Sequence, residues 1–172
     1  MQKIIVADPL KCTGCRTCEM VCSVKKLGMV NPVRARIHIV RFEENVLEVP
    51  MLCQQCDPAP CLKACPVRAI ERDEKTGVVK TNYDRCIGCK TCMVACPFGA
   101  TGYDPVVKKV FKCDQCDGDP TCVKFCETKA LQYVDSSTMN LRKSAETAQK
   151  VYDLLRKVNP ETRLAEVKKM NV

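Results

Sequence analysis

The sequence lacks most of the residues on which common enzyme sites depend. It contains no tryptophan, seven glycines and a single histidine, His38. No G-x-G-x-x-G fingerprint, phosphate-cradling glycine loop or Ser–His–Asp set is present, so we expect neither a nucleotide site nor a hydrolase triad. His38 lies in a strand-like stretch far in sequence from any cysteine, and we expect a surface or packing residue. These absences favour a chain that is not itself an enzyme.

Long apolar runs and export signals are missing as well. No run approaches the roughly 20 apolar residues of a membrane helix. The first residues, MQKIIVADPLKC, have no charged region followed by an apolar one and no twin arginine. We therefore expect a cytoplasmic protein with no membrane partner. Basic residues are not interleaved with aromatic ones, so we expect no nucleic-acid partner either.

Cysteine is the residue that the chain has in excess. Sixteen of its 172 residues are cysteine, a level typical of a disulfide scaffold or of a metal-loaded protein. Eight disulfides are not expected in a chain that stays in a reducing cytoplasm. The composition therefore predicts that the cysteines bind metal.

The cysteines form four groups of four, which makes the chain an internal repeat. Groups one and three, CTGCRTCEMVC (12–22) and CIGCKTCMVAC (86–96), share the spacing C-x₂-C-x₂-C-x₃-C of bacterial ferredoxins. Groups two and four, CQQCDPAPCLKAC (53–65) and CDQCDGDPTCVKFC (113–126), keep both ends of that spacing but widen the middle with turn-forming residues.

This spacing predicts cubane iron–sulfur clusters. Three cysteines at steps of three wrap one cluster, and the fourth, four residues on, points away to the partner cluster. A structural zinc module also uses four cysteines per site, but usually as two separated pairs and often with histidine. It remains the alternative of another class. Four oxidised clusters at about −2 each would offset the formal charge of +8.

The segments between and after the groups predict short secondary structure. Residues 34–43 alternate apolar and polar side chains like a strand, and residues 69–80 read as a hairpin with a turn ending at Gly77. EMVC and MVAC, after third cysteines, suggest helical turns. From Ser137 onward cysteine is absent, and a helical stripe appears at Leu141, Ala145, Ala148, Tyr152, Leu155 and Val158. We expect a cluster-binding region at 1–136 and a helical tail at 137–172.

The four motifs together, CTGCRTCEMVC, LCQQCDPAPCLKACP, YDRCIGCKTCMVACPFGA and KCDQCDGDPTCVKFC, resemble the four-cluster electron-transfer subunits of the dimethyl-sulfoxide-reductase type. That resemblance implies an α+β, double bacterial-ferredoxin-like fold, in which group one pairs with group four and group two with group three. It also implies four 4Fe–4S clusters and no catalytic residues. Their ligand sets would be Cys12, Cys15, Cys18 and Cys126 (cluster 1); Cys22, Cys113, Cys116 and Cys122 (cluster 2); Cys53, Cys56, Cys61 and Cys96 (cluster 3); and Cys65, Cys86, Cys89 and Cys92 (cluster 4).

The same resemblance implies an electron-relay subunit of a cytoplasmic oxidoreductase complex. A tungsten- or molybdenum-pterin catalytic subunit, such as an aldehyde oxidoreductase, is the favoured partner, together with a further redox subunit. A hydrogenase, a formate dehydrogenase or a carbon-monoxide dehydrogenase is the alternative partner. The tail at 137–172 lies outside the resemblance. Its stripe would either cover the cluster region or dock onto the catalytic subunit or a second copy of the chain.

Overall fold

The computed structural model describes residues 2–43, 47–137, 148–149 and 153 of the chain. It divides into two compact units, Met1–Asp135 and Ser136–Val172. The first unit holds every cysteine. Of the second unit, the described residues Ser136, Ser137, Ala148, Gln149 and Asp153 are helical. Most of the stripe from Leu141 to Val158 lies outside the described residues.

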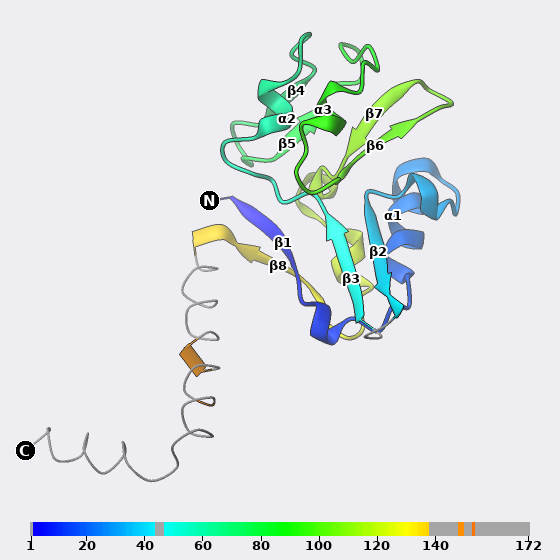
Figure 1. Ribbon diagram of the computed structural model, residues 1–172, viewed down its shortest axis with the longest axis vertical. Coiled ribbons are helices and arrows are strands. Elements are labelled where there is room, and N and C mark those ends of the chain that lie inside the picture. The colour runs from blue at the N-terminus through cyan, green and yellow to red at the C-terminus, as the bar shows by residue number, and fades with distance from the viewer. Residues whose placement is uncertain (1, 44–46, 138–147, 150–152, 154–172) are drawn as a thin grey trace, which may run out of the picture. The chain divides into compact units, whose positions relative to one another are not determined.

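Short strands and short helices alternate through the first unit (Figure 1). The strands are β1 (Lys3–Ala7), β2 (Ile37–Phe42), β3 (Leu47–Leu52), β4 (Ile70–Arg72), β5 (Val79–Thr81), β6 (Thr101–Asp104), β7 (Lys109–Lys112) and β8 (Leu131–Asp135). The α-helices are α1 (Thr17–Leu27), α2 (Pro60–Lys63), α3 (Thr91–Val94) and α4 (Thr121–Lys124). Three 3₁₀ turns are η1 (Pro9–Lys11), η2 (Pro32–Arg34) and η4 (Gln115–Gly118). This mixture agrees with the α+β class that the sequence predicts.

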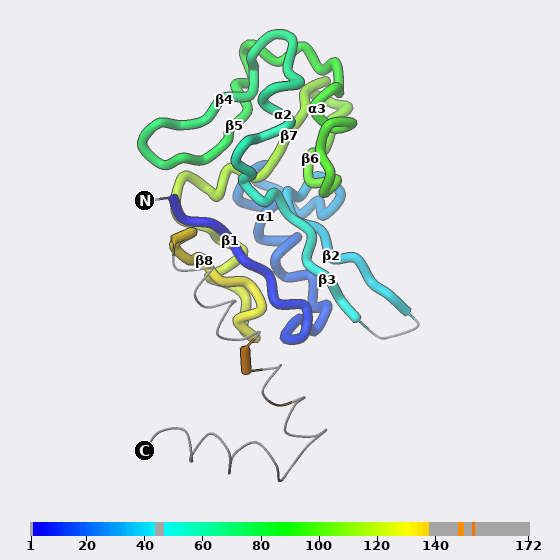
Figure 2. Tube along the Cα trace, turned by 60° about the vertical axis from the view of Figure 1, so that its left-hand side comes forward, coloured from blue at the N-terminus to red at the C-terminus, as the bar shows by residue number. Residues whose placement is uncertain are grey.

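The strands pair into four two-stranded antiparallel sheets, β1–β8, β2–β3, β4–β5 and β6–β7. Three are hairpins between neighbours in sequence, whereas β1–β8 joins the two ends of the first unit, with Lys3 opposite Asp135 and Ala7 opposite Leu131 (Figure 2). The strand expected at 34–43 and the hairpin expected at 69–80 are both present as β2 and β4–β5. Gly77 has φ +70°, a conformation that glycine adopts without a steric penalty.

Each helix begins one residue before the third cysteine of a group. Cys18, Cys61, Cys92 and Cys122 are therefore each the second residue of α1, α2, α3 and α4. The turns predicted just after the third cysteines, at 19–22 and 93–96, overlap α1 and α3, but these helices begin two residues earlier than predicted. The third cysteine is buried in all four groups because it lies on the inner face of its helix.

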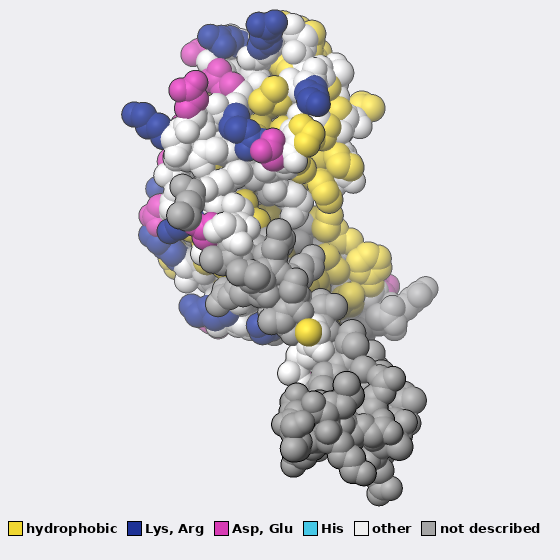
Figure 3. Space-filling view, turned by 90° about the vertical axis from the view of Figure 1, so that its left-hand side faces the viewer, with side chains coloured by type: hydrophobic (Ala, Val, Ile, Leu, Met, Phe, Trp, Pro, Cys, Tyr) yellow, Lys and Arg dark blue, Asp and Glu magenta, His cyan; other side chains and the backbone are white. Residues whose placement is uncertain are grey.

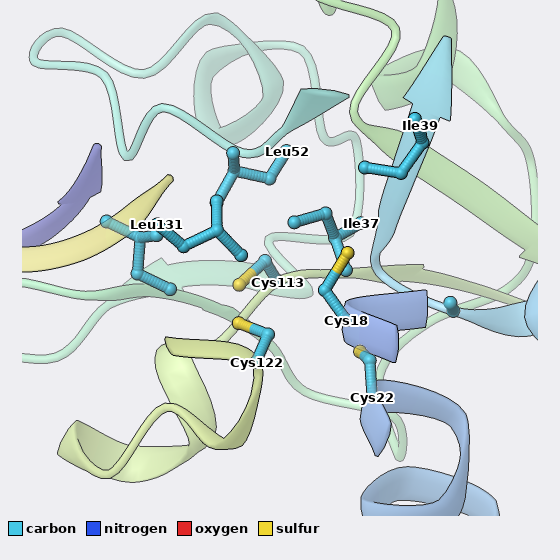
Figure 4. Close-up of a cluster of buried hydrophobic side chains, with 10 residues drawn as sticks. Cys18, Cys22, Ile37, Ile39, Leu52, Cys113, Cys122 and Leu131 are labelled. Atoms are coloured by element: carbon cyan, nitrogen blue, oxygen red, sulfur yellow. The ribbon is translucent and has the colours of Figure 1, made fainter. Parts of the chain in front are cut away.

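Two buried cores lie within the first unit. The first combines group-one and group-four cysteines, Cys18, Cys22, Cys113 and Cys122, with Ile5, Ile37, Leu52 and Leu131. Figure 4 shows Cys113 and Cys122 side by side beneath Leu52 and Leu131, with Cys22 approaching from α1. The second core combines group-two and group-three cysteines, Cys61, Cys86 and Cys92, with Ile70, Val79 and Val110. Helix α1 packs on α4, and α2 packs on α3. The first core therefore joins groups one and four, and the second joins groups two and three.

Hydrogen bonds connect the elements around these cores. The buried carboxylate of Glu19 on α1 accepts a 2.7 Å hydrogen bond from the backbone N–H of Ile39 on β2. Arg34 at the end of η2 forms an ion pair with the buried Asp104 at the end of β6. A buried polar group is stabilising only when it is paired, so these contacts fix α1 against β2 and η2 against β6.

The described surface mixes both signs of charge. On the face shown in Figure 3, Lys and Arg side chains alternate with Asp and Glu, beside a band of apolar side chains. His38 is exposed, and its Nδ1 lies 4.0 Å from the buried Oε1 of Glu19, as expected for a surface residue. Within the described residues, none of the helices is both apolar and long enough to span a bilayer.

Candidate metal centres

The cysteine loops of groups one and three share one backbone conformation. In both, the glycine before the second cysteine and the basic residue after it have positive φ: Gly14 and Arg16, Gly88 and Lys90. At Gly88 a Cβ would lie 2.3 Å from the carbonyl oxygen of Lys108, which no other residue could accommodate. These left-handed residues on either side of the second cysteine curl the loop, so its cysteines face a common interior.

Three cavities are each lined by four cysteines. Each cavity has about 340 Å³ of space free of atoms, part of it open to solvent. One is lined by Cys12, Cys15, Cys18 and Cys126, a second by Cys22, Cys113, Cys116 and Cys122, and a third by Cys53, Cys56, Cys61 and Cys96. We call them the first, second and third cavity. Every set takes three cysteines from one group and the fourth from another.

The remaining four cysteines are less completely gathered. Cys86 and Cys92 are buried in the second core, and the half-buried Cys65 packs against it. Cys89 is exposed, with its Sγ 3.4 Å from the hydroxyl oxygen of Thr91. The charges of both Cys89 and Cys65 act on Cys92, so the four lie in the same neighbourhood.

Burial makes several of these thiols poor acids while no metal is bound. It raises the pKa of Cys18 and of Cys113 to about 12 and that of Cys92 to about 11, and it raises the pKa of Cys122 further still. A thiolate is nevertheless the form that binds metal. Metal binding at these positions must therefore release protons, and the positive charge of the metal must compensate for the lost solvation.

Two exposed cysteines differ from the buried ones. Hydrogen bonds from the hydroxyl and the backbone of Thr17 lower the pKa of Cys15, and those from Thr91 lower the pKa of Cys89 in the same way. Both cysteines are the second of their group, and both threonines stand two residues later. These equivalent positions are thus prepared to carry negative charge at the surface.

Backbone N–H groups also point at cysteine sulfurs. The N–H of Ala69 donates to Cys65 Sγ at 3.2 Å, that of Arg36 to Cys22 at 3.3 Å and that of Leu131 to Cys126 at 3.4 Å. Each of these three cysteines is the last of its group. Hydrogen bonds to ligand sulfur stabilise the thiolate form and are among the determinants of cluster potential.

The second cavity contains buried donors without a partner. The amide nitrogen Nε2 of Gln115, a residue that is 1% exposed, and the Nε and Nη1 atoms of Arg36 are buried and have no hydrogen-bond partner in the structure. Gln115 and Arg36 both line this cavity. Because unpaired buried donors are costly, they fit an acceptor-rich, negatively charged group held by the four thiolates. A cysteine-ligated iron–sulfur cluster is such a group.

Among the described residues, no three His, Cys, Asp or Glu side chains are arranged to hold one common metal ion. A cubane makes a different demand, since each of its four irons takes a single thiolate.

Several polar residues beside the cysteines were not predicted from the sequence, although the repeat marks them. Thr17 and Thr91 both precede the third cysteine of their groups, and Gln55 and Gln115 both precede the second cysteine of theirs. Gln55 and Gln115 also share a left-handed backbone, with φ of 52° and 55°. Aligning the groups in pairs would have shown that these polar residues recur at fixed offsets from the cysteines.

Comparison with known proteins agrees with the chemistry of the cysteine groups. Residues 45–136 match the model of a 4Fe–4S dicluster domain family, and residues 9–25 match that of a 4Fe–4S binding domain.

Similar curated proteins come from archaea and bacteria. The polyferredoxin-like subunit of aliphatic sulfonate oxidoreductase from Pyrococcus furiosus is 38% identical over 90% of this chain and 91% of its own. Electron transport protein HydN of Escherichia coli is 37% identical over 81% of this chain and 91% of its own. Formate hydrogenlyase subunit 2 of Escherichia coli is 32% identical over 80% and 84%. The chain belongs to the family of ferredoxin-like iron–sulfur electron-transport proteins with 4Fe–4S domains.

Proposed function

We propose that this chain is a non-catalytic electron-relay subunit of an oxidoreductase complex and that it holds four 4Fe–4S clusters. The observation that carries the proposal is the set of three cavities, each lined by four cysteines drawn from two groups. This mixing of groups is the pattern of a ferredoxin cluster pair, in which the last cysteine of one group serves the other cluster.

The proposed ligands are the cysteines of the first, second and third cavities, with Cys65, Cys86, Cys89 and Cys92 as a fourth set. The two cores support this pairing, because one joins groups one and four and the other joins groups two and three. On this basis the first unit is a double ferredoxin-like fold. A bound 4Fe–4S cluster supplies one-electron redox chemistry. The chain itself supplies thiolates, a partly apolar lining, and the N–H donors that stabilise negative charge on sulfur.

For the partner we propose a tungsten- or molybdenum-pterin enzyme, and for the location the cytoplasm. The support is the resemblance of the four motifs to subunits of that type, together with a relative that is itself a subunit of an oxidoreductase. A formate- or hydrogen-converting complex is the second candidate, favoured by the similarity to HydN and to formate hydrogenlyase subunit 2.

The cluster content is tested on protein purified anaerobically from its native cell. We expect about sixteen irons and sixteen sulfides per chain, four of each for every cubane, and a broad absorbance near 400 nm that dithionite bleaches. A colourless protein containing zinc would establish the alternative, because zinc has no redox chemistry. A stoichiometry near twelve irons would contradict four cubanes.

The partner is tested on the same preparation. A protein that co-purifies with the chain should be identified by mass spectrometry, and its tungsten and molybdenum should be measured. A partner that contains nickel and neither of these metals would favour the hydrogen-converting alternative.

A further inference from the structure

Strands β3 and β7 end at equivalent positions of the internal repeat. β3 ends at Leu52, directly before the first cysteine of group two, and β7 ends at Lys112, directly before the first cysteine of group four. The two side chains are buried to a similar degree, with Leu52 1% and Lys112 2% exposed. One equivalent position therefore carries an apolar side chain and the other a cationic one.

Each of these two residues lines the cavity that contains the cysteine following the other residue. Leu52 lines the second cavity, with Cys113, whereas Lys112 lines the third cavity, with Cys53. Each strand thus ends with one residue in one cavity and the following cysteine in the other. The side chain of Lys112 consequently lines the third cavity, whereas the next residue, Cys113, lines the second.

The ammonium of Lys112 has an unusual set of partners for a buried charge. Its Nζ donates a 2.6 Å hydrogen bond to the carbonyl oxygen of Val79, which also lines the third cavity. In the described part of the chain no carboxylate forms an ion pair with it. A buried ammonium has three donors and strongly prefers an anionic partner. Within the third cavity, the thiolates of Cys53, Cys56, Cys61 and Cys96 are the available source of negative charge.

We propose that Lys112 raises the reduction potential of the cluster held by Cys53, Cys56, Cys61 and Cys96, acting as its buried counter-charge. The inference rests on the proposed function, since it requires a cluster in the third cavity. Reduction adds one electron to a site of about −2. A fixed positive charge in a low-dielectric interior favours that more negative state, and solvent screens it little. Lys112 would therefore make this cluster a better electron acceptor than its cysteines alone would.

The test compares variants that separate charge from packing. Lys112→Gln removes the charge but keeps an amide donor for Val79, and Lys112→Arg keeps the charge. Lys63→Gln is the matched control, because it removes an exposed lysine two residues after Cys61. Potentials are measured by redox titration followed with electron paramagnetic resonance. The signal of the third-cavity cluster is identified as the one that Cys56→Ser perturbs.

We expect Lys112→Gln to lower the ratio of reduced to oxidised cluster at a fixed potential at least tenfold, which for one electron is a shift of about 59 mV. Lys112→Arg and Lys63→Gln should change that ratio less than threefold. Should Lys112→Gln fail to incorporate clusters, Lys112→Met, with a similar volume and no charge, takes its place. The inference is overturned if the uncharged variants leave the reduction potential of this cluster unchanged, or if Lys112→Arg shifts it as far as Lys112→Gln does. Failure of the proposed function looks different, since the wild-type protein would then lack the four clusters.

Discussion

At the scale of the residue, the last cysteine of each group decides how the groups are linked. Cys22 lines the second cavity with three group-four cysteines, and Cys126 lines the first cavity with three group-one cysteines. We therefore predict that Cys22→Ser perturbs the spectrum of the cluster held by Cys113, Cys116 and Cys122, while Cys126→Ser perturbs the other. Electron paramagnetic resonance of the two variants provides the measurement. The reverse assignment, or signals of the first-cavity and second-cavity clusters that both stay unchanged in both variants, would contradict crossed ligation.

The threonines beside exposed cysteines allow a second residue-scale prediction. The hydroxyl of Thr91 donates to Cys89 Sγ at 3.4 Å, and such a bond contributes about 1 kcal/mol. Thr91→Val should lower the potential of the cluster that Cys89 serves by about 40 mV, because the more negative reduced state loses a donor. Thr17→Val is the matched control, which should shift the Cys15 cluster instead. Equal shifts of both clusters in either variant would show a general loss of packing.

At the scale of the element, the ion pair between Arg34 and Asp104 ties η2 to β6. Burial by itself raises the pKa of Asp104, but hydrogen bonds from Arg34 and from the backbone N–H groups of Val106 and Val107 outweigh it, so the pKa is lowered. The stabilisation is then present above the unfolded pKa of about 3.9 and is lost as the pH falls through the lower folded value.

A double-mutant cycle with Arg34→Met and Asp104→Asn should give a coupling energy of about 1–3 kcal/mol at pH 7. The stability of each variant is measured by titration with guanidinium chloride, in which the loss of cluster absorbance is followed. The advantage of the wild type over Asp104→Asn should fade below about pH 4. The exposed pair of Arg85 and Glu71, with side chains 59% and 54% exposed, serves as control and should couple by less than about 1 kcal/mol. Equal coupling in both cycles would mean that burial does not strengthen the Arg34–Asp104 pair.

At the scale of the whole molecule, the tail remains a prediction, because most of it lies outside the described residues. An isolated helix of this length is marginal in water, so its apolar stripe requires a surface. If that surface is a partner or a second copy, deleting residues 137–172 should leave the four-cluster spectrum intact and abolish co-purification or reduce the assembly size in gel filtration. If it is the chain's own surface, the deletion should lower solubility and accelerate cluster loss. A truncated protein that keeps its clusters and assembles normally would contradict both.

The sequence by itself determined the chemistry and much of the local structure. The spacing of the sixteen cysteines is local along the chain, and it indicated 4Fe–4S sites, a family that the comparisons confirm. The alternation in residues 34–43 and the turn before Gly77 likewise predicted β2 and the β4–β5 hairpin, since both depend on near neighbours. The helix starts were predicted two residues late because the N-cap residues, Arg16, Ala59, Lys90 and Pro120, are not the Ser, Thr, Asp or Asn that mark a helix start.

Only the tertiary structure decided which side chains surround each set of cysteines. Lys112 lines the third cavity, although the next residue, Cys113, lines the second. Arg36, directly before β2, also lines the second cavity. The ion pair of Arg34 with Asp104 joins residues 70 positions apart. Such contacts arise when separate loops fold against one another, and no local pattern records them. The sequence therefore indicated the candidate ligands, whereas the packing of β3, β7 and η2 decided the charges and donors around them.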